Sequence, residues 1–402
     1  MAEYYYEKVN RLINECEAAY TNAINEKQYD AAREAATKAY QLAARIAEDK
    51  GEKDYLRNTY RQKMNLWAAR LEKLKNAHVS VPVQGAAEDG DKTPRFAAET
   101  VKSDIRFSDI AGLDDVKALL RNKVIGPINH PEVMGMYKKK PSRTIQVLLY
   151  GPPGTGKTMF AEALANELDM SMHRCKASEI IDSRLGQSIR NIKAYMDSII
   201  ADESPKILAF VDEFDAIAGK RSKSTDGADG EMNRVVNELL QGIDAMVKAN
   251  TDRSIVFVAT TNRPDSIDSA ILRGKRLDTQ VYVGLPDQEA RRFLVKKSLG
   301  GGVPPLASNV NLDTIADFLE GYSSADISTI CERIGDRPLF RHYETGVASV
   351  VTTEDVNDVI AHSPKSISGE ELGEYIKYNE QKGYKTPKTD LIVYQKYLAQ
   401  RK

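Results

Sequence analysis

The run Gly151-Pro-Pro-Gly-Thr-Gly-Lys-Thr158 has the residue types and spacing of a phosphate-binding loop. It follows an apolar, strand-like run, Val147-Leu-Leu-Tyr150, and precedes a helix-like run that ends near Leu168. Its glycines allow backbone N–H groups to turn around phosphates, and Lys157 can reach the β- and γ-phosphates of a nucleotide. The Thr158 hydroxyl can bind Mg²⁺. We therefore expect this loop to bind a nucleoside triphosphate through Pro152, Pro153, Gly154, Thr155, Gly156, Lys157, Thr158 and Met159.

A pair of carboxylates follows a second apolar run, Ile207-Leu-Ala-Phe-Val211. The strand predicted here delivers Asp212 and Glu213 to the edge of a sheet, beside the phosphate-binding loop. Asp212 is placed to hold Mg²⁺ through water, and Glu213 to orient and polarise an attacking water. Alone, this pair is equally typical of a solvated acidic turn; its position after the loop favours catalysis.

A third apolar run ends in Thr260-Thr261-Asn262. Asn262 can hydrogen-bond the γ-phosphate or the attacking water, which would make it a sensor of hydrolysis. Turns of the type Asn-x-Pro are common at strand ends, so order along the chain, not residue type, supports this role.

Two arginines three positions apart, Arg273 and Arg276, precede a further strand-like run. Such a pair can project from one subunit to the γ-phosphate in its neighbour as arginine fingers. A solvated basic turn is the alternative interpretation.

Composition limits the classes of function. The chain has 402 residues, a net charge of −1 and 42% hydrophobic residues, as a soluble protein of two or three domains would. No global charge favours nucleic acid, and no run approaches a membrane span. The N-terminus is acidic and aromatic, unlike a signal peptide.

The three cysteines, Cys16, Cys175 and Cys331, do not have the spacing of metal ligands. We therefore expect reduced thiols in a cytoplasmic protein.

The first 77 residues contain no proline, and apolar positions recur at helical spacing. They predict three helices, near residues 4–25, 29–49 and 54–77, in an all-α three-helix bundle. Residues 78–104 are polar and punctuated by Gly and Pro, which predicts a flexible linker.

Residues 105–286 alternate strand-like and helix-like runs, which predicts an α/β domain with a parallel sheet. The strand candidates are Val147–Tyr150, His173–Lys176, Ile207–Val211, Ile255–Ala259 and Gln280–Val283. Residues 287–363 predict a small helical lid domain. Residues 364–402, here called the tail, predict one helix from Gly369 to Gln381 and another after Pro387.

In combination, the motifs at Gly151–Thr158, Asp212-Glu213, Thr261-Asn262, Arg273/Arg276 and Gly321-Tyr-Ser-Ser-Ala-Asp326 resemble those of the AAA ATPase family. The segment around Gly112 resembles the one that lines the adenine pocket there. The resemblance covers residues 105 to about 363. It implies a P-loop NTPase core with a helical lid, ATP and Mg²⁺ as cofactors, and a homo-oligomeric ring, usually a hexamer, in which the two arginines act in trans.

The flanks resemble the group with katanin, spastin, fidgetin and the ESCRT-disassembling ATPase. In that group an N-terminal MIT domain binds helical peptides of partner proteins, and a C-terminal helix packs on the AAA core. The resemblance implies that residues 1–77 recruit a protein partner and that any membrane contact is indirect.

The central-pore loop departs from the group. Leu185 and Gly186 match, but Arg184 stands where the group has an aromatic residue, and Ser183 where it has lysine. Arginine lacks the apolar ring that packs between substrate side chains. A second pore loop is predicted at Ser224–Glu231; it is rich in glycine and acidic, which disfavours nucleic acid.

These patterns favour an ATP-hydrolysing remodeller of a protein complex or filament. The alternative is a nucleic-acid-associated or regulatory switch ATPase without peptide threading, in which Arg184 meets phosphates. A scaffold that binds ATP with little turnover fits less well, because the residues for hydrolysis are present.

Overall fold

The computed structural model describes residues 99–137, 143–182, 186–221, 227–249, 253–273 and 276–401, together with residues 13, 16, 20, 36–40, 43–44, 60–61, 63–64 and 67–68. The chain divides into two units, Met1–Lys92 and Thr93–Lys402, and each is described by itself.

The described residues of the first unit are all helical and come from each of the three helices that the sequence predicts. Cys16, Ala36, Ala39 and Trp67 are buried in one cluster. The ring of Tyr20 meets that of Trp67 edge to face, with centroids 5.5 Å apart. Small alanine side chains on the middle segment allow this close approach. The three segments therefore share a core, while the predicted helix ends lie outside the described residues.

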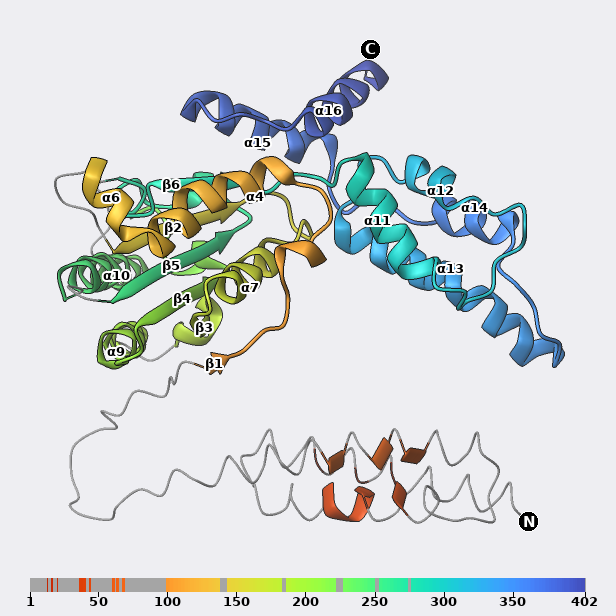
Figure 1. Ribbon diagram of the computed structural model, residues 1–402, viewed down its shortest axis with the longest axis horizontal. Coiled ribbons are helices and arrows are strands. Elements are labelled where there is room, and N and C mark those ends of the chain that lie inside the picture. Colours follow the sequence, from red (N-terminus) through yellow and green to blue (C-terminus); the bar gives the residue numbers. More distant parts are fainter. Residues whose placement is uncertain are drawn as a thin grey trace. The chain divides into compact units, whose positions relative to one another are not determined.

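The second unit is built on a six-stranded sheet with the order β1-β3-β4-β5-β2-β6 (Figure 1). All pairings are parallel except that of β1 with β3. The strands are β1 (Glu99–Val101), β2 (Thr144–Tyr150), β3 (Ser171–Lys176), β4 (Lys206–Asp212), β5 (Ser254–Thr261) and β6 (Thr279–Tyr282). The five strands predicted from apolar runs are all present, and the mixed α/β fold class is confirmed.

Strand β1 lies inside the stretch 78–104 that the sequence predicts as linker. It pairs with the edge of β3, with Glu99 opposite Arg174 and Val101 opposite Met172. Three residues are too few to show an alternating pattern, so only the pairing with β3 defines this strand. Residues 99–101 therefore do not belong to the predicted linker.

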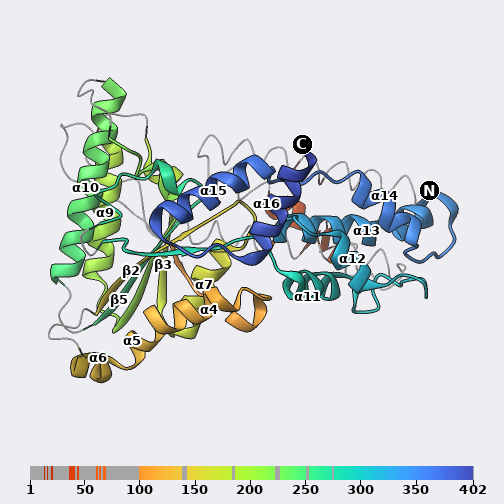
Figure 2. The same cartoon turned by 90° about the horizontal axis from the view of Figure 1, so that it is seen from above.

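Helices cover both faces of the sheet, as a parallel sheet requires (Figure 2). One face packs against α9 (Gln187–Ala201) and α10 (Gly227–Ala249), and the other against α4 (Asp114–Leu120) and α7 (Lys157–Glu167). The remaining elements of this domain are 3₁₀ turns at Phe107–Asp109, Phe214–Ala216 and Pro264–Ser266, a π-helical turn at Arg121–Ile125, and the short helices α5 (Gly126–Asn129), α6 (Pro131–Tyr137) and α8 (Ala177–Ile180).

Four helices form a separate small core after the sheet: α11 (Gln288–Leu299), α12 (Leu312–Phe318), α13 (Ser324–Thr345) and α14 (Thr353–Ala361). Side-chain caps define all four of their starts. At α12, the Asn311 side chain accepts from the N–H groups of Asp313 and Thr314. Asp287, Ser323 and Thr352 each accept a hydrogen bond from a backbone N–H of the first turn. This segment corresponds to the predicted lid.

The tail forms α15 (Gly369–Lys382) and α16 (Lys388–Gln400), close to the predicted bounds. Ser368 and Glu371 make a capping box that starts α15. Leu372 and Ile376 of α15 are buried with Leu285, which lies between the sheet and the lid. None of the helices in the described part of the chain has the length and apolar character that crossing a membrane requires.

Candidate active site

The phosphate-binding loop joins the end of β2 to the start of α7. Gly151, Gly154 and Gly156 have φ angles of 144°, 71° and 92°, in the region that favours glycine. Thr155 is 2% exposed, and its hydroxyl donates to the carbonyl oxygen of Pro152 at 2.9 Å. This geometry explains why the sequence places glycine at these three positions.

Lys157 begins α7 and is only 8% exposed. Its ammonium group donates to the carbonyl oxygens of Gly151 and Pro152, at 2.9 and 2.6 Å. Burial lowers the pKa of Lys157 to about 8, against the opposing effect of the Asp212 and Asp215 carboxylates. A buried cation held by carbonyl oxygens alone is well suited to exchange those partners for phosphate oxygens.

Thr158 and Asp212 bring two hard oxygen ligands together. The Thr158 hydroxyl donates to Asp212 Oδ2 at 3.2 Å, and the buried Thr260 hydroxyl donates to Asp212 Oδ1. Mg²⁺ in nucleotide sites takes one or two protein oxygens, with water and phosphate oxygens completing the shell. The residues present therefore fit this ion, as the sequence predicts.

Glu213 follows β4 directly and is exposed. Its φ angle is 54°, which is uncommon for a residue with a side chain. Its backbone N–H donates to Asp212 Oδ1 at 3.1 Å. The backbone of Glu213 is thus held in a sparsely populated conformation beside the Asp212 carboxylate, as is often seen at functional sites.

Asn262 follows β5 and is exposed. The preceding residue is anchored, because the Thr261 hydroxyl donates to Asp215 at 2.7 Å and accepts from the Arg263 N–H at 2.8 Å. Strands β4, β5 and β2 are consecutive in the sheet. Glu213, Asn262 and the phosphate-binding loop follow these three strands, so the fold brings them to one edge.

The lid contributes to the same region. The N–H of Ala325, at the start of α13, donates to the carbonyl oxygen of Gly154 at 3.0 Å. A Cβ at Gly154 would lie 2.8 Å from the Ser323 hydroxyl. Gly112 also lies at the junction with the lid, because a Cβ there would approach Asp287 Oδ1 to 2.7 Å. The motif at Gly321–Asp326 is the sequence signal for the contact of the lid with Gly154.

The two predicted arginine fingers have different surroundings. Arg273 is exposed, and its Nε donates to the carbonyl oxygen of Ser269 at 3.1 Å. Arg276 donates to both carboxylate oxygens of Asp244 on α10, at 3.0 and 2.8 Å, and to the carbonyl oxygen of Ala270. The partnership of Arg276 with Asp244 has no signal in the sequence.

The predicted pore residues Arg184 and Leu185 lie outside the described residues. The loop's far end is anchored, because the Gly186 N–H donates to Glu231 on α10 at 2.9 Å. The second pore segment was predicted as a loop through Glu231, but α10 begins at Gly227, so its last five residues are helical. A long helix that packs on α9 overrides the local preference of the two glycines there.

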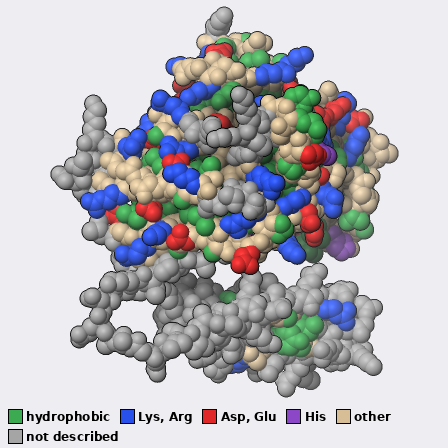
Figure 3. Space-filling model, turned by 60° about the vertical axis from the view of Figure 1, so that its left-hand side comes forward, with side chains coloured by type: hydrophobic (Ala, Val, Ile, Leu, Met, Phe, Trp, Pro, Cys, Tyr) green, Lys and Arg blue, Asp and Glu red, His purple; other side chains and the backbone are tan. Residues whose placement is uncertain are grey.

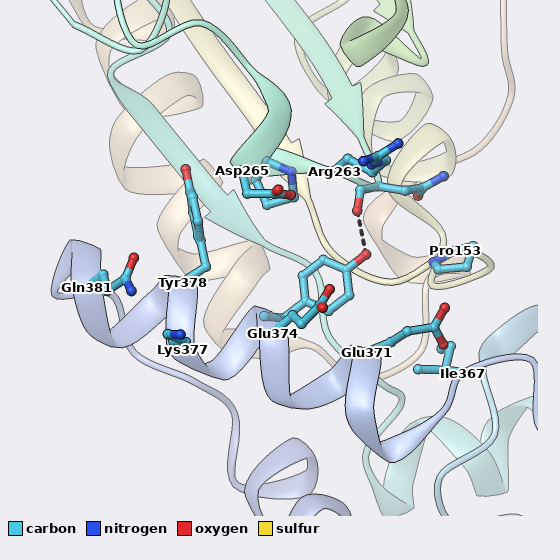
Figure 4. Close-up of a pocket in the computed structure, with 12 residues that line it drawn as sticks. Pro153, Arg263, Asp265, Ile367, Glu371, Glu374, Lys377, Tyr378 and Gln381 are labelled. Carbon is cyan, nitrogen blue, oxygen red and sulfur yellow. Dashed lines mark hydrogen bonds between the residues drawn. The ribbon is translucent and has the colours of Figure 1, made fainter. Parts of the chain in front are cut away.

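The tail reaches this edge of the sheet, which the motifs do not indicate. A hollow of about 600 Å³ lies between α15 and the loops that follow β2 and β5, and Figure 4 shows Pro153, Arg263, Asp265 and Tyr378 around it. The Tyr375 hydroxyl donates to the backbone carbonyl of Asn262, which is the dashed line in Figure 4. The resemblance of the flanks implied a C-terminal helix packed on the core, but not this contact of Tyr375 with Asn262.

Two comparisons with known proteins agree with this geometry. Residues 147–285 match the family described as the ATPase family associated with various cellular activities (AAA). The fold is similar to a crystal structure of the AAA domain of FIGL-1 in complex with ADP, with a TM-score of 0.57 and 24% sequence identity. The match covers 71% of this chain and 92% of that one.

Proposed function

Starting from the AAA ATPase domain that this chain contains, we propose that it hydrolyses ATP with Mg²⁺ to remodel or disassemble a protein complex or filament. The observation that carries the proposal is the meeting of three loops at one sheet edge. Lys157, Glu213 and Asn262 follow three neighbouring strands. Binding alone would require only the first of them.

Each residue has a part in the proposed reaction. Lys157 and the loop N–H groups bind the phosphates, and Thr158 and Asp212 hold Mg²⁺. The bound ion supplies positive charge that neutralises the developing charge on the phosphate oxygens. Glu213 accepts a proton from the attacking water, and Asn262 orients that water against the γ-phosphate.

We further propose that the protein works as a homo-oligomeric ring, with six subunits as is usual for the family. The exposed guanidinium of Arg273 supports this, because a side chain that projects into solvent is free to complete a neighbour's site. Arg276 has the same proposed role once it leaves Asp244.

Recruitment of a protein partner is assigned to residues 1–77, as an MIT-like bundle in a cytoplasmic protein. The shared core of Cys16, Ala36, Ala39 and Trp67 supports a helical bundle. Any contact with a membrane would then pass through the recruited partner.

The alternative function, a nucleic-acid-associated or regulatory switch, rests on Arg184 alone. On the face of the second unit that Figure 3 shows, Lys and Arg side chains are interspersed with Asp and Glu. Nucleic-acid binding uses a basic patch or stripe, and the mixed charges of this face do not supply one.

The test is Glu213→Gln in the full chain. We expect wild-type nucleotide affinity and a loss of hydrolysis of about a hundredfold or more, because the amide cannot accept the proton. Glu289→Gln, an exposed residue on α11, controls for the loss of one charge. Wild-type turnover by Glu213→Gln would refute the assignment.

The same variant tests remodelling, because it holds the ATP-bound ring on its target. We expect a protein to co-purify with it and to be lost when residues 1–92 are deleted. Recovery of nucleic acid instead would favour the alternative function.

A further inference from the structure

We propose that Tyr375, on the tail helix α15, is a positioning residue for ATP hydrolysis that acts by holding the backbone of Asn262. The proposal rests on the proposed function, in which Asn262 orients the attacking water. It assigns to the tail a part in the chemistry that none of the nucleotide-site motifs supplies.

The contact joins residues 113 positions apart. The Tyr375 hydroxyl donates to the carbonyl oxygen of Asn262, the residue whose side chain is the proposed sensor. The two residues that flank Asn262 are also joined, because the Thr261 hydroxyl accepts a hydrogen bond from the Arg263 N–H. Within the loop, the Arg263 carbonyl oxygen also accepts from the N–H and the hydroxyl of Ser266, whereas the Asn262 carbonyl oxygen is held from the tail.

Much of this loop is exposed. Asn262, Arg263 and Asp265 are exposed, and the hollow of about 600 Å³ lies against them (Figure 4). A loop with little packing depends on its hydrogen bonds for a defined position. A small displacement of a water-orienting group is costly for catalysis.

The Tyr375 hydroxyl is itself well fixed. Further along α15, the buried Asn379 accepts from the Tyr150 hydroxyl at 2.6 Å. The Tyr375 ring packs on Tyr282 with centroids 6.0 Å apart. Tyr150 is the last residue of β2, so α15 is anchored to the end of β2 and to the loop after β5.

The hydroxyl also remains a donor across the working range of pH. Burial raises the pKa of Tyr375, and the nearby carboxylates of Glu371 and Asp265 raise it further. The neutral phenol is therefore the form that meets the Asn262 carbonyl, and the interaction does not depend on a charge.

Tyr375→Phe removes only the hydroxyl and keeps the ring packing. We expect kcat for ATP to fall about three- to tenfold, the effect of one lost hydrogen bond, with KM for ATP, ADP affinity and thermal midpoint unchanged. Tyr378→Phe is the matched control, because it removes a hydroxyl from the same helix that binds Gln280 instead. Its kcat should remain at the wild-type value.

A double-mutant cycle separates positioning from a general structural effect. If Tyr375 acts through Asn262, adding Tyr375→Phe to Asn262→Ala causes no further loss of kcat. Full additivity of the two losses, an unchanged kcat in Tyr375→Phe, or a parallel loss in Tyr378→Phe would each overturn the proposal.

Wild type and Glu213→Gln are assayed beside these variants. If wild type hydrolyses ATP and Glu213→Gln does not, the ATPase assignment stands, and a wild-type kcat for Tyr375→Phe defeats the positioning role alone. Absence of hydrolysis by wild type overturns both, since there would be no reaction to position.

Discussion

Arg276 and Asp244 form a two-point ion pair within one chain, with N–O distances of 3.0 and 2.8 Å. The hydrogen bond from Arg276 is the main cause that lowers the pKa of Asp244, and the pair raises the pKa of Arg276 in turn. Arg276 is therefore committed to α10, whereas Arg273, three positions earlier, is exposed. A residue that acts in a neighbouring subunit must first be released from such a partner.

Mixing experiments distinguish the two arginines. We expect Arg273→Ala subunits, mixed with wild type, to lower ATP hydrolysis more steeply than their share of the mixture, because each would disable a neighbour's site. Arg276→Ala should do the same and also lower the thermal midpoint, since it removes the partner of Asp244. Asp244→Asn, which weakens the pair but keeps Arg276, is the control. A loss strictly proportional to the mutant fraction would contradict shared sites.

Nucleotide binding should be coupled to proton uptake by Lys157. The pKa of this group is lowered to about 8 in the free site, and phosphate favours its charged form, so binding raises the pKa. Affinity for ATP therefore falls as pH rises through about 8, and near that pH the protein takes up a proton on binding. Calorimetry in buffers of different ionisation enthalpy measures this uptake.

Lys157→Met removes both the charge and the proton. It should lose nucleotide affinity by more than about tenfold and show no buffer-dependent enthalpy. An enthalpy of wild-type binding that is identical in all buffers at pH 8 would show that Lys157 is already fully charged in the free protein.

Dependence on Mg²⁺ should follow the Thr158 hydroxyl. Thr158→Val removes the oxygen next to Asp212 at similar volume, so we expect hydrolysis to need much higher Mg²⁺ concentrations. Thr158→Ser keeps the oxygen and should retain the wild-type Mg²⁺ requirement. Titration of ATPase activity with Mg²⁺ compares the two, and equal requirements in both variants would exclude Thr158 as a ligand.

Asp390 should make the fold less stable as pH rises. It is fully buried in α16, and its Oδ1 accepts from the Leu285 N–H at 3.1 Å. Burial raises its pKa from 3.8 to about 6. As pH rises, this carboxyl loses its proton near pH 3.8 in the unfolded chain but only near pH 6 in the folded one, so the free energy of unfolding falls as pH rises from 3.8 through about 6. At neutral pH the loss of stability is on the order of 3 kcal/mol.

Asp390→Asn keeps an oxygen for the Leu285 N–H and removes the charge. Its gain in thermal midpoint over wild type should grow from pH 5 to pH 7, a range chosen around the pKa of about 6. Glu344→Gln, an exposed carboxyl on α13, should show no such trend. A variant less stable than wild type at neutral pH would contradict the expected penalty.

The elements of the nucleotide site were predictable because their signals are local. A strand buried on both faces must be apolar throughout, so Ile207–Val211 and Ile255–Ala259 stand out in the sequence. Backbone that turns around phosphates needs glycine at positive φ, which marks the loop from Gly151 to Gly156. Such constraints act within a few residues and can be recognised without knowing the neighbours.

The sequence by itself therefore determined the strands and loops of the candidate nucleotide site, the α/β core with its lid, and the helices of the tail. Only the tertiary structure decided that Glu99–Val101 joins the sheet, that Arg276 pairs with Asp244, and that Tyr375 holds Asn262. Each of these joins segments distant in the chain through one or two hydrogen bonds or a short pairing. Such contacts require no particular residue pattern on either side, because they depend on which surfaces the packed core brings together.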